Sequence, residues 1–191
     1  MTKILEGKKG LVVGIANDHS IAWGIAKSLS DEGASMYLTY QNDSIKTRVD
    51  PLSEKINCLG IMPCDVSDTS SLESVRDGIN GNIDFFVHAV AYSDKNELSG
   101  KYLNTSKENF LKTLHISAYS LTEMIRLFSP KMNDGASIMA LTYYGSTRYM
   151  QSYNVMGVAK AALETSIRYL SVEMGDRGIR VHASSAGPMR T

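Results

Sequence analysis

The sequence has little cysteine, no excess of charge of either sign, and no long hydrophobic run. Only Cys58 and Cys64 occur among its 191 residues, and they show neither CxxC nor Cys/His spacing. We interpret them as two reduced thiols of an intracellular protein rather than as a metal or redox site. The chemistry of this chain is therefore expected to need no metal.

The balance of charge and the absence of long apolar segments argue against nucleic-acid-binding and membrane proteins. The 20 basic residues match 20 acidic ones, so no broad field favours nucleic acid or an anionic membrane as partner, although a local basic patch is compatible with these numbers. No run approaches the length that crosses a bilayer, and the beginning of the chain, MTKILEGKKG, lacks signal-peptide architecture. We expect a cytoplasmic protein without nucleic-acid or membrane partners.

What the sequence does contain is a regular alternation of short apolar runs with longer segments of helical spacing. The expected strands are 10–14, 35–40, 59–66, 83–91, 136–142 and 178–185, and the expected helices are 20–32, 43–57, one capped by Ser67 or Asp68, 107–132 and 152–175. Strands separated by helices indicate βαβ units. We predict one α/β domain over residues 1–191, a doubly wound parallel sheet with helices on both faces (a Rossmann fold).

Such sheets bind ligands beyond the carboxyl ends of their strands, where the winding direction switches. This rule places a candidate site without reference to any reaction. The segments expected there are 14–21, 41, 65–66, 88–93, 141–153 and 187–191.

The connection after the first strand is a candidate phosphate loop. Gly14 and Ala16 allow a tight turn, and the following helix offers free amides and the positive end of its dipole. The stretch does not match G-x-G-x-x-G. A purely structural turn is therefore the open alternative.

The next two strand ends bear on which dinucleotide is bound. The second strand leads into Gln41, which is neutral, and no cation follows before Lys46. A 2′-phosphate would require a cation there, so NADH is favoured over NADPH, although Lys46 or Arg48 could reach back. Asp65, after the third strand, is placed either to contact the adenine amine or simply to cap a helix.

The segment SYNVMGVAKAALE, residues 152–164, carries the candidate catalytic pair. Tyr153 and Lys160 are seven residues apart, so on a helix they differ by about 20° and lie about 10 Å apart along the axis. A nearby cation lowers the pKa of a phenol and helps it to stabilise an oxyanion, and the lysine could also hold ribose hydroxyls. The alternative is an exposed tyrosine and a solvated lysine. The small, apolar neighbours and the upstream Tyr143 favour catalysis.

Several motifs, in order along nearly the whole chain, resemble one family. They are GIANDHSIAWGIA, TYQND, CDV, ISAYS, YYGSTRYMQSYNVMGVAKA and SSAGPMRT. Together they resemble the enoyl-acyl-carrier-protein reductases of bacterial type II fatty-acid synthesis, within the short-chain dehydrogenase/reductase superfamily. Most of that superfamily has Tyr and Lys four apart and a Ser thirteen residues before the Tyr. Here those two positions hold Met156 and Ala140, whereas the enoyl reductases share the longer spacing and the additional tyrosine.

A physical reason for the longer spacing can be offered as a hypothesis. Ketone reduction puts hydride on the carbon whose oxygen must be stabilised. Reduction of an enoyl thioester puts hydride on the β-carbon, while charge gathers on an oxygen two carbons away. Three more residues of helix move the phenol by about 4.5 Å, in the sense that this requires.

The resemblance implies NADH-dependent reduction of the double bond of trans-2-enoyl-acyl-carrier-protein. Tyr153 would donate a hydrogen bond to the enolate oxygen, Lys160 would hold the nicotinamide ribose, and Tyr143 would line the pocket. The implied cofactor contacts are Gly14, Ser20, Ile21, Gln41, Asp65, Val66, Val90, Lys160, Met189 and Thr191, and the implied substrate contacts are Ser93 and Met156. The implied partners are acyl carrier protein and three further copies, in a homotetramer built through the two long helices.

Two departures and two rival functions accompany this resemblance. Ala91 replaces a family glycine, which adds a methyl group near the nicotinamide. The chain also stops at Thr191, before the last strand of the family, and we expect that further residues follow. The rivals are a carbonyl-reducing relative such as a 3-oxoacyl reductase, and a non-catalytic dinucleotide-binding protein. His88 is expected to be buried, and neither it nor His115 has a partner at metal or triad spacing.

Overall fold

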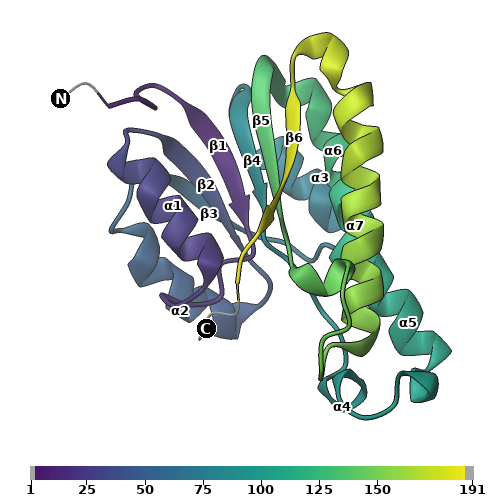
Figure 1. The fold of residues 1–191 in the computed structure, drawn as a ribbon. Coiled ribbons are helices and arrows are strands. Elements are labelled where there is room, and N and C mark those ends of the chain that lie inside the picture. Colours follow the sequence, from purple (N-terminus) through teal and green to yellow (C-terminus); the bar gives the residue numbers. More distant parts are fainter. Residues whose placement is uncertain (1–2, 188–191) are drawn as a thin grey trace.

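The computed structural model, which describes residues 3–187, is built on one parallel sheet of six strands in the order β3-β2-β1-β4-β5-β6 (Figure 1). The strands are β1 (Lys9–Val13), β2 (Ser35–Tyr40), β3 (Cys58–Pro63), β4 (Ile83–His88), β5 (Met132–Thr142) and β6 (Arg180–Ser185). From β1 the chain winds outward to β3, and then returns to the centre and winds the other way from β4. The predicted doubly wound fold is confirmed, and its switch point lies between β1 and β4.

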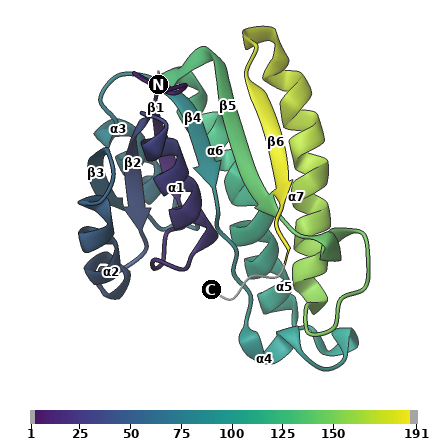
Figure 2. The ribbon, with the colours of Figure 1, turned by 60° about the vertical axis from the view of Figure 1, so that its left-hand side comes forward.

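The helices cover both faces of this sheet (Figures 1 and 2). They are α1 (Ile21–Asp31), α2 (Asp43–Ser53), α3 (Thr69–Gly78), α4 (Lys95–Leu98), α5 (Lys107–Leu114), α6 (Ser120–Phe128) and α7 (Asn154–Glu173). Helices α1 and α2 lie on one face, and α3, α5, α6 and α7 lie on the other. None of the helices within residues 3–187 is both long and apolar enough to cross a membrane.

Two apolar cores result from the alternation of side chains along the strands. In β1, Leu11 and Val13 point into the core under α3, α6 and α7, whereas Val12 points into the core under α1 and α2. Strand β5 has one fully covered face, where Ile138 and its alternate neighbours are buried, while on the other face Met139 is half-buried against the core under α1 and α2. Within residues 3–187, no helix covers the α1 side of β5 and β6 (Figure 2).

The amino-terminal caps of two helices follow local chemistry, whereas one interruption of a helix does not. Asn42 accepts a hydrogen bond from the Ile45 amide at the start of α2, and Asp68 accepts one from the Ser70 amide at the start of α3. The helical structure predicted over 107–132 is present, and it ends with the short turn Ser129–Lys131, but a π-helical turn, His115–Tyr119, lies within it between α5 and α6. That turn holds Ser117, whose hydroxyl bonds both the N–H and the C=O of Tyr92.

Candidate active site

The loops at the carboxyl ends of the strands enclose three adjoining pockets. The Gln41 pocket is lined by Gln41, Asp65 and Tyr92 among others, the Gly14 pocket by Gly14, Asn17 and Ser20, and the Tyr153 pocket by Tyr143, Tyr153 and Lys160. Ala89 lines all three, so the pockets form one groove across the switch point of the sheet. This is where a doubly wound fold binds its ligand.

Gly14 is required by the geometry of the groove. Its φ is +106°, a conformation that L side chains rarely adopt, and a Cβ there would collide with the carbonyl of Ala89. The chain then enters α1 through Ser20, whose hydroxyl donates to the Asn17 carbonyl (2.6 Å) rather than capping the helix amides. The first turn of α1, which contains Ile21 and no acidic residue, is left open to an anion. The turn thus has a structural need for glycine, and it also leads into the open amino end of α1.

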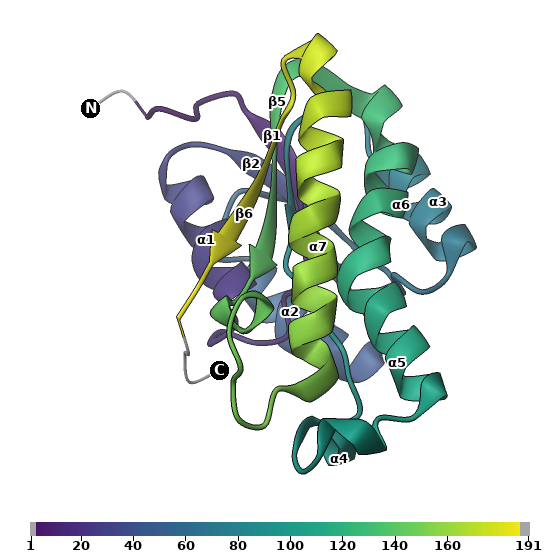
Figure 3. The ribbon, with the colours of Figure 1, turned by 45° about the vertical axis from the view of Figure 1, so that its right-hand side comes forward.

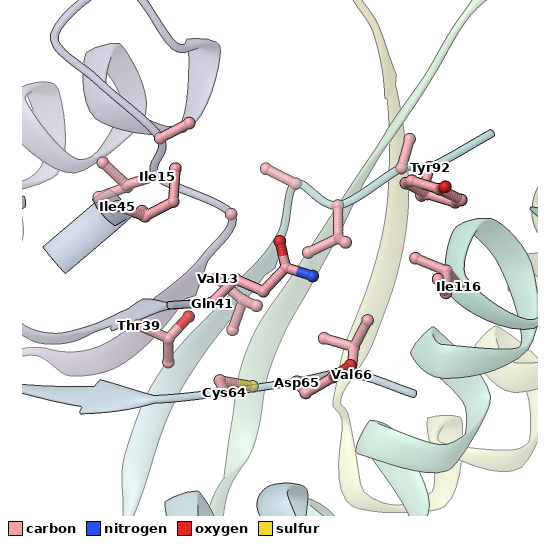
Figure 4. Close-up of a pocket in the computed structure, with 15 residues that line it drawn as sticks. Val13, Ile15, Thr39, Gln41, Ile45, Cys64, Asp65, Val66, Tyr92 and Ile116 are labelled. Atoms are coloured by element: carbon pink, nitrogen blue, oxygen red, sulfur yellow. The ribbon is translucent and has the colours of Figure 1, made fainter. Parts of the chain in front are cut away.

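The Gln41 side chain lies across its pocket (Figure 4), close to the end of β3. The Nζ atom of Lys46 is 2.8 Å from the Asp50 carboxylate, a contact that raises the pKa of Lys46, and it lies 5.9 Å from the centre of the Tyr40 ring. Arg48 is exposed on α2 and does not line the pocket. Neither cation lines the pocket, whose lining includes the neutral Gln41 and the acidic Asp65.

Asp65 is not a helix cap, because Asp68 has that role. One Asp65 oxygen, Oδ1, accepts hydrogen bonds from the hydroxyl (2.6 Å) and the amide (2.9 Å) of Ser67. These bonds lower the pKa of Asp65, with smaller effects from Lys112 and His115. An ionised carboxylate therefore lies beside Val66 at the edge of the Gln41 pocket, suitable for accepting a hydrogen bond from an amine.

Sequence reasoning missed part of this pocket. Thr39, Ile45, Cys64 and Ile116 also line it. Cys64 is a free thiol whose pKa is raised to about 12 by burial and by Asp65, so it acts as an apolar wall. Ile116 comes from the π-helical turn, and no motif marks it. Thr39 and Cys64 lie near the ends of predicted strands, which is the signal that could have found them, whereas Ile45 lies in the first turn of α2.

The candidate catalytic residues share one pocket. Tyr143, Tyr153 and Lys160 line it together with Ile21 and Val90, and the two tyrosine rings meet edge to face with centroids 5.0 Å apart. Tyr153 itself precedes the helix: α7 begins at Asn154, and Tyr153 has φ −124° and ψ −27°. Tyr153 and Lys160 thus line one pocket, as their spacing predicted. The Tyr153 phenol, however, is carried by the turn before α7 and not by the helix itself.

The expectation that Lys160 lowers the pKa of Tyr153 is wrong for this structure. Burial, followed by the neighbouring Tyr143, raises the pKa of Tyr153 to about 12. The Lys160 ammonium instead donates to the Leu141 carbonyl at 2.7 Å, which fixes it at the end of β5. The phenol therefore keeps its proton at neutral pH and can donate it in a hydrogen bond.

Lys160 is almost completely buried, with 5% of its surface exposed. Burial lowers its pKa to about 8, an effect that Glu164 partly opposes. Since one N–H is used by Leu141, the remaining two are available to a ligand in the Tyr153 pocket. Glu164 is itself held by the Thr142 hydroxyl at 2.6 Å.

The two expected substrate contacts do not line these pockets. Ser93 is buried, and its hydroxyl lies within hydrogen-bond distance of Asn109 and Thr113 (3.2 and 3.0 Å). This corrects the expectation that its side chain faces substrate. Met156 is buried in the first turn of α7 and lines none of the three pockets, whereas Ala91 lines two of them. Met189 and Thr191 lie outside the described residues.

The histidine at the end of β4 is buried, as expected. Its Nε2 lies 2.8 Å from the Ser120 hydroxyl, and burial, with Lys160 as a second cause, lowers the pKa of His88 to about 3. His88 does not line the groove. No cluster of three or more potential metal ligands occurs within residues 3–187.

Comparisons with known proteins identify the family that this chain is similar to. Residues 14–191 match the family model described as enoyl-(acyl carrier protein) reductase. Enoyl-[acyl-carrier-protein] reductase [NADH] 1 of Rhizobium meliloti is 51% identical over 98% of this chain and 70% of its own length. Its counterpart FabI of Rickettsia typhi is 48% identical over 100% of this chain and 74% of its own length.

Solved structures show the same likeness. The reductase of Anaplasma phagocytophilum, solved in complex with NAD, is 51% identical with a TM-score of 0.93, over 96% of this chain and 72% of that one. FabI of Candidatus Liberibacter asiaticus is 46% identical with a TM-score of 0.96, over 98% of this chain and 74% of that one.

Proposed function

The chain belongs to the enoyl-(acyl carrier protein) reductase family, and we propose that it reduces the double bond of a trans-2-enoyl thioester on acyl carrier protein with NADH. The observation that carries the proposal is the single pocket formed by Tyr143, Tyr153 and Lys160. That pocket adjoins the glycine turn after β1, as a dinucleotide requires.

The groove has the features needed to hold NADH, which supplies the hydride when bound. Gly14 approaches the Ala89 carbonyl so closely that any Cβ would collide with it, which brings the backbones of the loops after β1 and β4 together in the groove. We assign the pyrophosphate to Gly14, Ser20 and Ile21, and the adenosine to Gln41, Asp65 and Val66. Lys160 would hold the nicotinamide ribose, with Val90 at the middle of the cofactor. Met189 and Thr191 remain sequence-based assignments.

Tyr153 is assigned the role of stabilising the oxygen that gains charge. Hydride addition at C3 of the enoyl thioester moves negative charge to the thioester oxygen. A phenol with a pKa of about 12 is protonated at neutral pH, so it donates a hydrogen bond to that oxygen. Tyr143 lies against the Tyr153 ring and lines the substrate side. Met156 is retained as a proposed substrate neighbour, whereas Ser93 could offer only its backbone.

The decisive experiment compares NADH oxidation with a crotonyl thioester and with a 3-oxoacyl thioester. We expect turnover of the enoyl substrate only. Because one oxyanion donor contributes about 10²–10³-fold to kcat, Tyr153→Phe should lower kcat by about that factor while the NADH dissociation constant is unchanged.

Tyr149→Phe is the matched control, because Tyr149 is 88% exposed in the same loop. Turnover of only the 3-oxoacyl substrate would favour the carbonyl-reducing rival, and absence of any turnover would favour the non-catalytic one. Tyr153→Phe with an unchanged rate would remove Tyr153 from its assigned role.

We also propose a homotetramer that acts in the cytoplasm. Val158, Tyr169 and Val172 are exposed on α7 and recur at helical spacing, so they form one apolar stripe on this helix. Leu111 and Tyr119, on α5 and the π-helical turn, are exposed as well. Exposed apolar side chains gathered on neighbouring helices support contact between copies.

A further inference from the structure

The backbone at Tyr153 has a conformation that something must hold in place. Ser152 (φ 58°) and Asn154 (φ 33°), the residues on either side of it, are the only non-glycine residues with positive φ within residues 3–187. Asparagine tolerates this region better than most residues. The phenol is therefore presented by an unusual turn rather than by regular helix.

The Asn154 side chain fastens this turn to α4. Its Nδ2 donates to the carbonyl of Glu97 at 2.9 Å, and it lies 3.4 Å from the carbonyl of Ser99. Both carbonyls lie at the carboxyl end of α4, where helix carbonyls have no partner within the helix. Figure 3 shows α4 next to the first turn of α7 and the start of α5.

Helix α4 is too short to be rigid alone, and it is held by hydrogen bonds that join its half-buried Glu97 to the exposed Ser106 and the buried Asn109. The Glu97 carboxylate accepts hydrogen bonds from the Ser106 amide (2.9 Å), the Ser106 hydroxyl (2.8 Å) and the Asn109 amide group (3.1 Å). Asn109, which is 6% exposed, also accepts from the backbone N–H of Asp94 at 2.9 Å. Both ends of α4 are thus fixed to α5.

The π-helical turn that follows α5 is in turn bonded to the loop after β4. Ser117 bonds the backbone of Tyr92 through both its N–H (2.9 Å) and its C=O (3.1 Å). Tyr92 directly follows Ala91, which lines the pocket. Hydrogen bonds through α5 and α4 therefore link the loop after β4, which lines the pocket through Ala91, to the turn that carries Tyr153.

We propose that Asn154 is a positioning residue for Tyr153, an inference that rests on the proposed function. Its amide fixes the first turn of α7 against α4, and so sets the distance between the phenol and the wall formed by the loop after β4. Asn154 touches neither cofactor nor substrate in this role. It acts on the reaction only through the direction of the Tyr153 hydroxyl.

Two substitutions separate the backbone and side-chain contributions of Asn154. Asn154→Gly keeps the positive φ and deletes the amide, whereas Asn154→Asp keeps the shape and places a carboxylate oxygen against two carbonyls. Since misplacement of a reacting group by about 1 Å can cost about 10²-fold, we expect kcat to fall about tenfold in Asn154→Gly and further in Asn154→Asp. The NADH dissociation constant should stay within about twofold, because the Gly14 and Gln41 pockets lie elsewhere. Asn96→Asp, on the exposed surface of α4, is the control for charge.

A double-mutant comparison distinguishes positioning from a general structural role. In a Tyr153→Phe background, Asn154→Gly should cost less than about twofold in kcat, because the group that it positions is already absent. An equal cost in both backgrounds would overturn the proposal, as would a wild-type kcat in Asn154→Gly.

Failure of the proposed function would be recognised separately, because the wild-type chain would then not reduce the enoyl thioester. Amide hydrogen exchange decides the inference in that case. Residues 94–99 and 153–157 should lose protection together in Asn154→Gly but not in Asn96→Asp. Unchanged protection in Asn154→Gly would overturn the coupling between α4 and the turn.

Discussion

Tyr153 and Lys160 line the same pocket but depend on different neighbours. The phenol lies against the Tyr143 ring, and its pKa is raised to about 12. The ammonium bonds the Leu141 carbonyl, and burial lowers its pKa to about 8. At neutral pH both groups therefore carry their protons, so the pair supplies hydrogen-bond donors to two different parts of a bound complex.

The lowered pKa of Lys160 predicts how cofactor affinity changes with pH. The ammonium loses its proton as the pH rises through about 8, so the NADH dissociation constant should increase between about pH 7 and about pH 9. Fluorescence titration across this range measures the change. Lys160→Arg stays charged throughout and should remove the dependence, whereas constant wild-type affinity would show that the charge is not needed.

His88 predicts a loss of stability in acid. Its pKa is about 3 in the folded protein and about 6.5 in an unfolded chain, so the unfolded state binds the proton first as the pH falls. The free energy of unfolding that depends on the neutral His88 is fully present above about pH 6.5. It falls by about 1.4 kcal/mol per pH unit as the pH drops from there toward pH 3. Urea unfolding at about pH 7 and pH 5 should show a smaller change for His88→Gln than for the wild type. His182→Gln, at an exposed position in β6, should behave like the wild type.

The helices and strands differ in how far sequence alone predicts them. Strand β2 was predicted residue for residue, and the helix caps Asn42 and Asp68 follow local chemistry. The π-helical turn was not predictable, because no residue pattern in this segment marks it; in the folded chain its Ser117 bonds Tyr92, which is distant in sequence. The partners of the Ser93 hydroxyl were not predictable either, since only the folded chain brings Asn109 and Thr113 to it.

Two glycines, one in the loop after β1 and one in α1, give opposite predictions for the same substitution. Gly14→Ala should abolish NADH binding and destabilise the fold, since its Cβ would meet the Ala89 carbonyl and its φ is +106°. A Cβ at Gly24 in α1 would meet nothing within 4 Å. Gly24→Ala should therefore stabilise the protein by about 0.5–1 kcal/mol without changing NADH affinity. Urea unfolding and fluorescence titration of both variants check this contrast.

At the scale of the whole molecule, the winding of the sheet decides which parts of the site were predictable. Every loop assigned to the groove follows the carboxyl end of a strand, and this rule predicted the segments that hold Gln41, Asp65 and Tyr153. The direction of individual side chains within those segments was not predictable, because burial and partners from other elements determine it.

The apolar stripe on α7 predicts the effect of a surface charge on assembly. Val172→Glu, at a position that is 78% exposed in the single chain, should convert the proposed tetramer to smaller species in light scattering after size exclusion. Leu59→Glu, on the edge strand β3 and 45% exposed, should leave the assembly intact. An unchanged mass for Val172→Glu would contradict the proposed interface.

Because all strands of the sheet are parallel, the assigned residues gather at their carboxyl ends, and the amino ends of the strands carry none of them. The turn before β4, which contains Gly81 and the exposed Asn82, lies at the amino ends of the strands, a full strand length from the groove. A fluorescent dye or a surface linker attached at Asn82 would leave every assigned residue untouched. The chain could therefore be immobilised through Asn82 with its groove facing the solution.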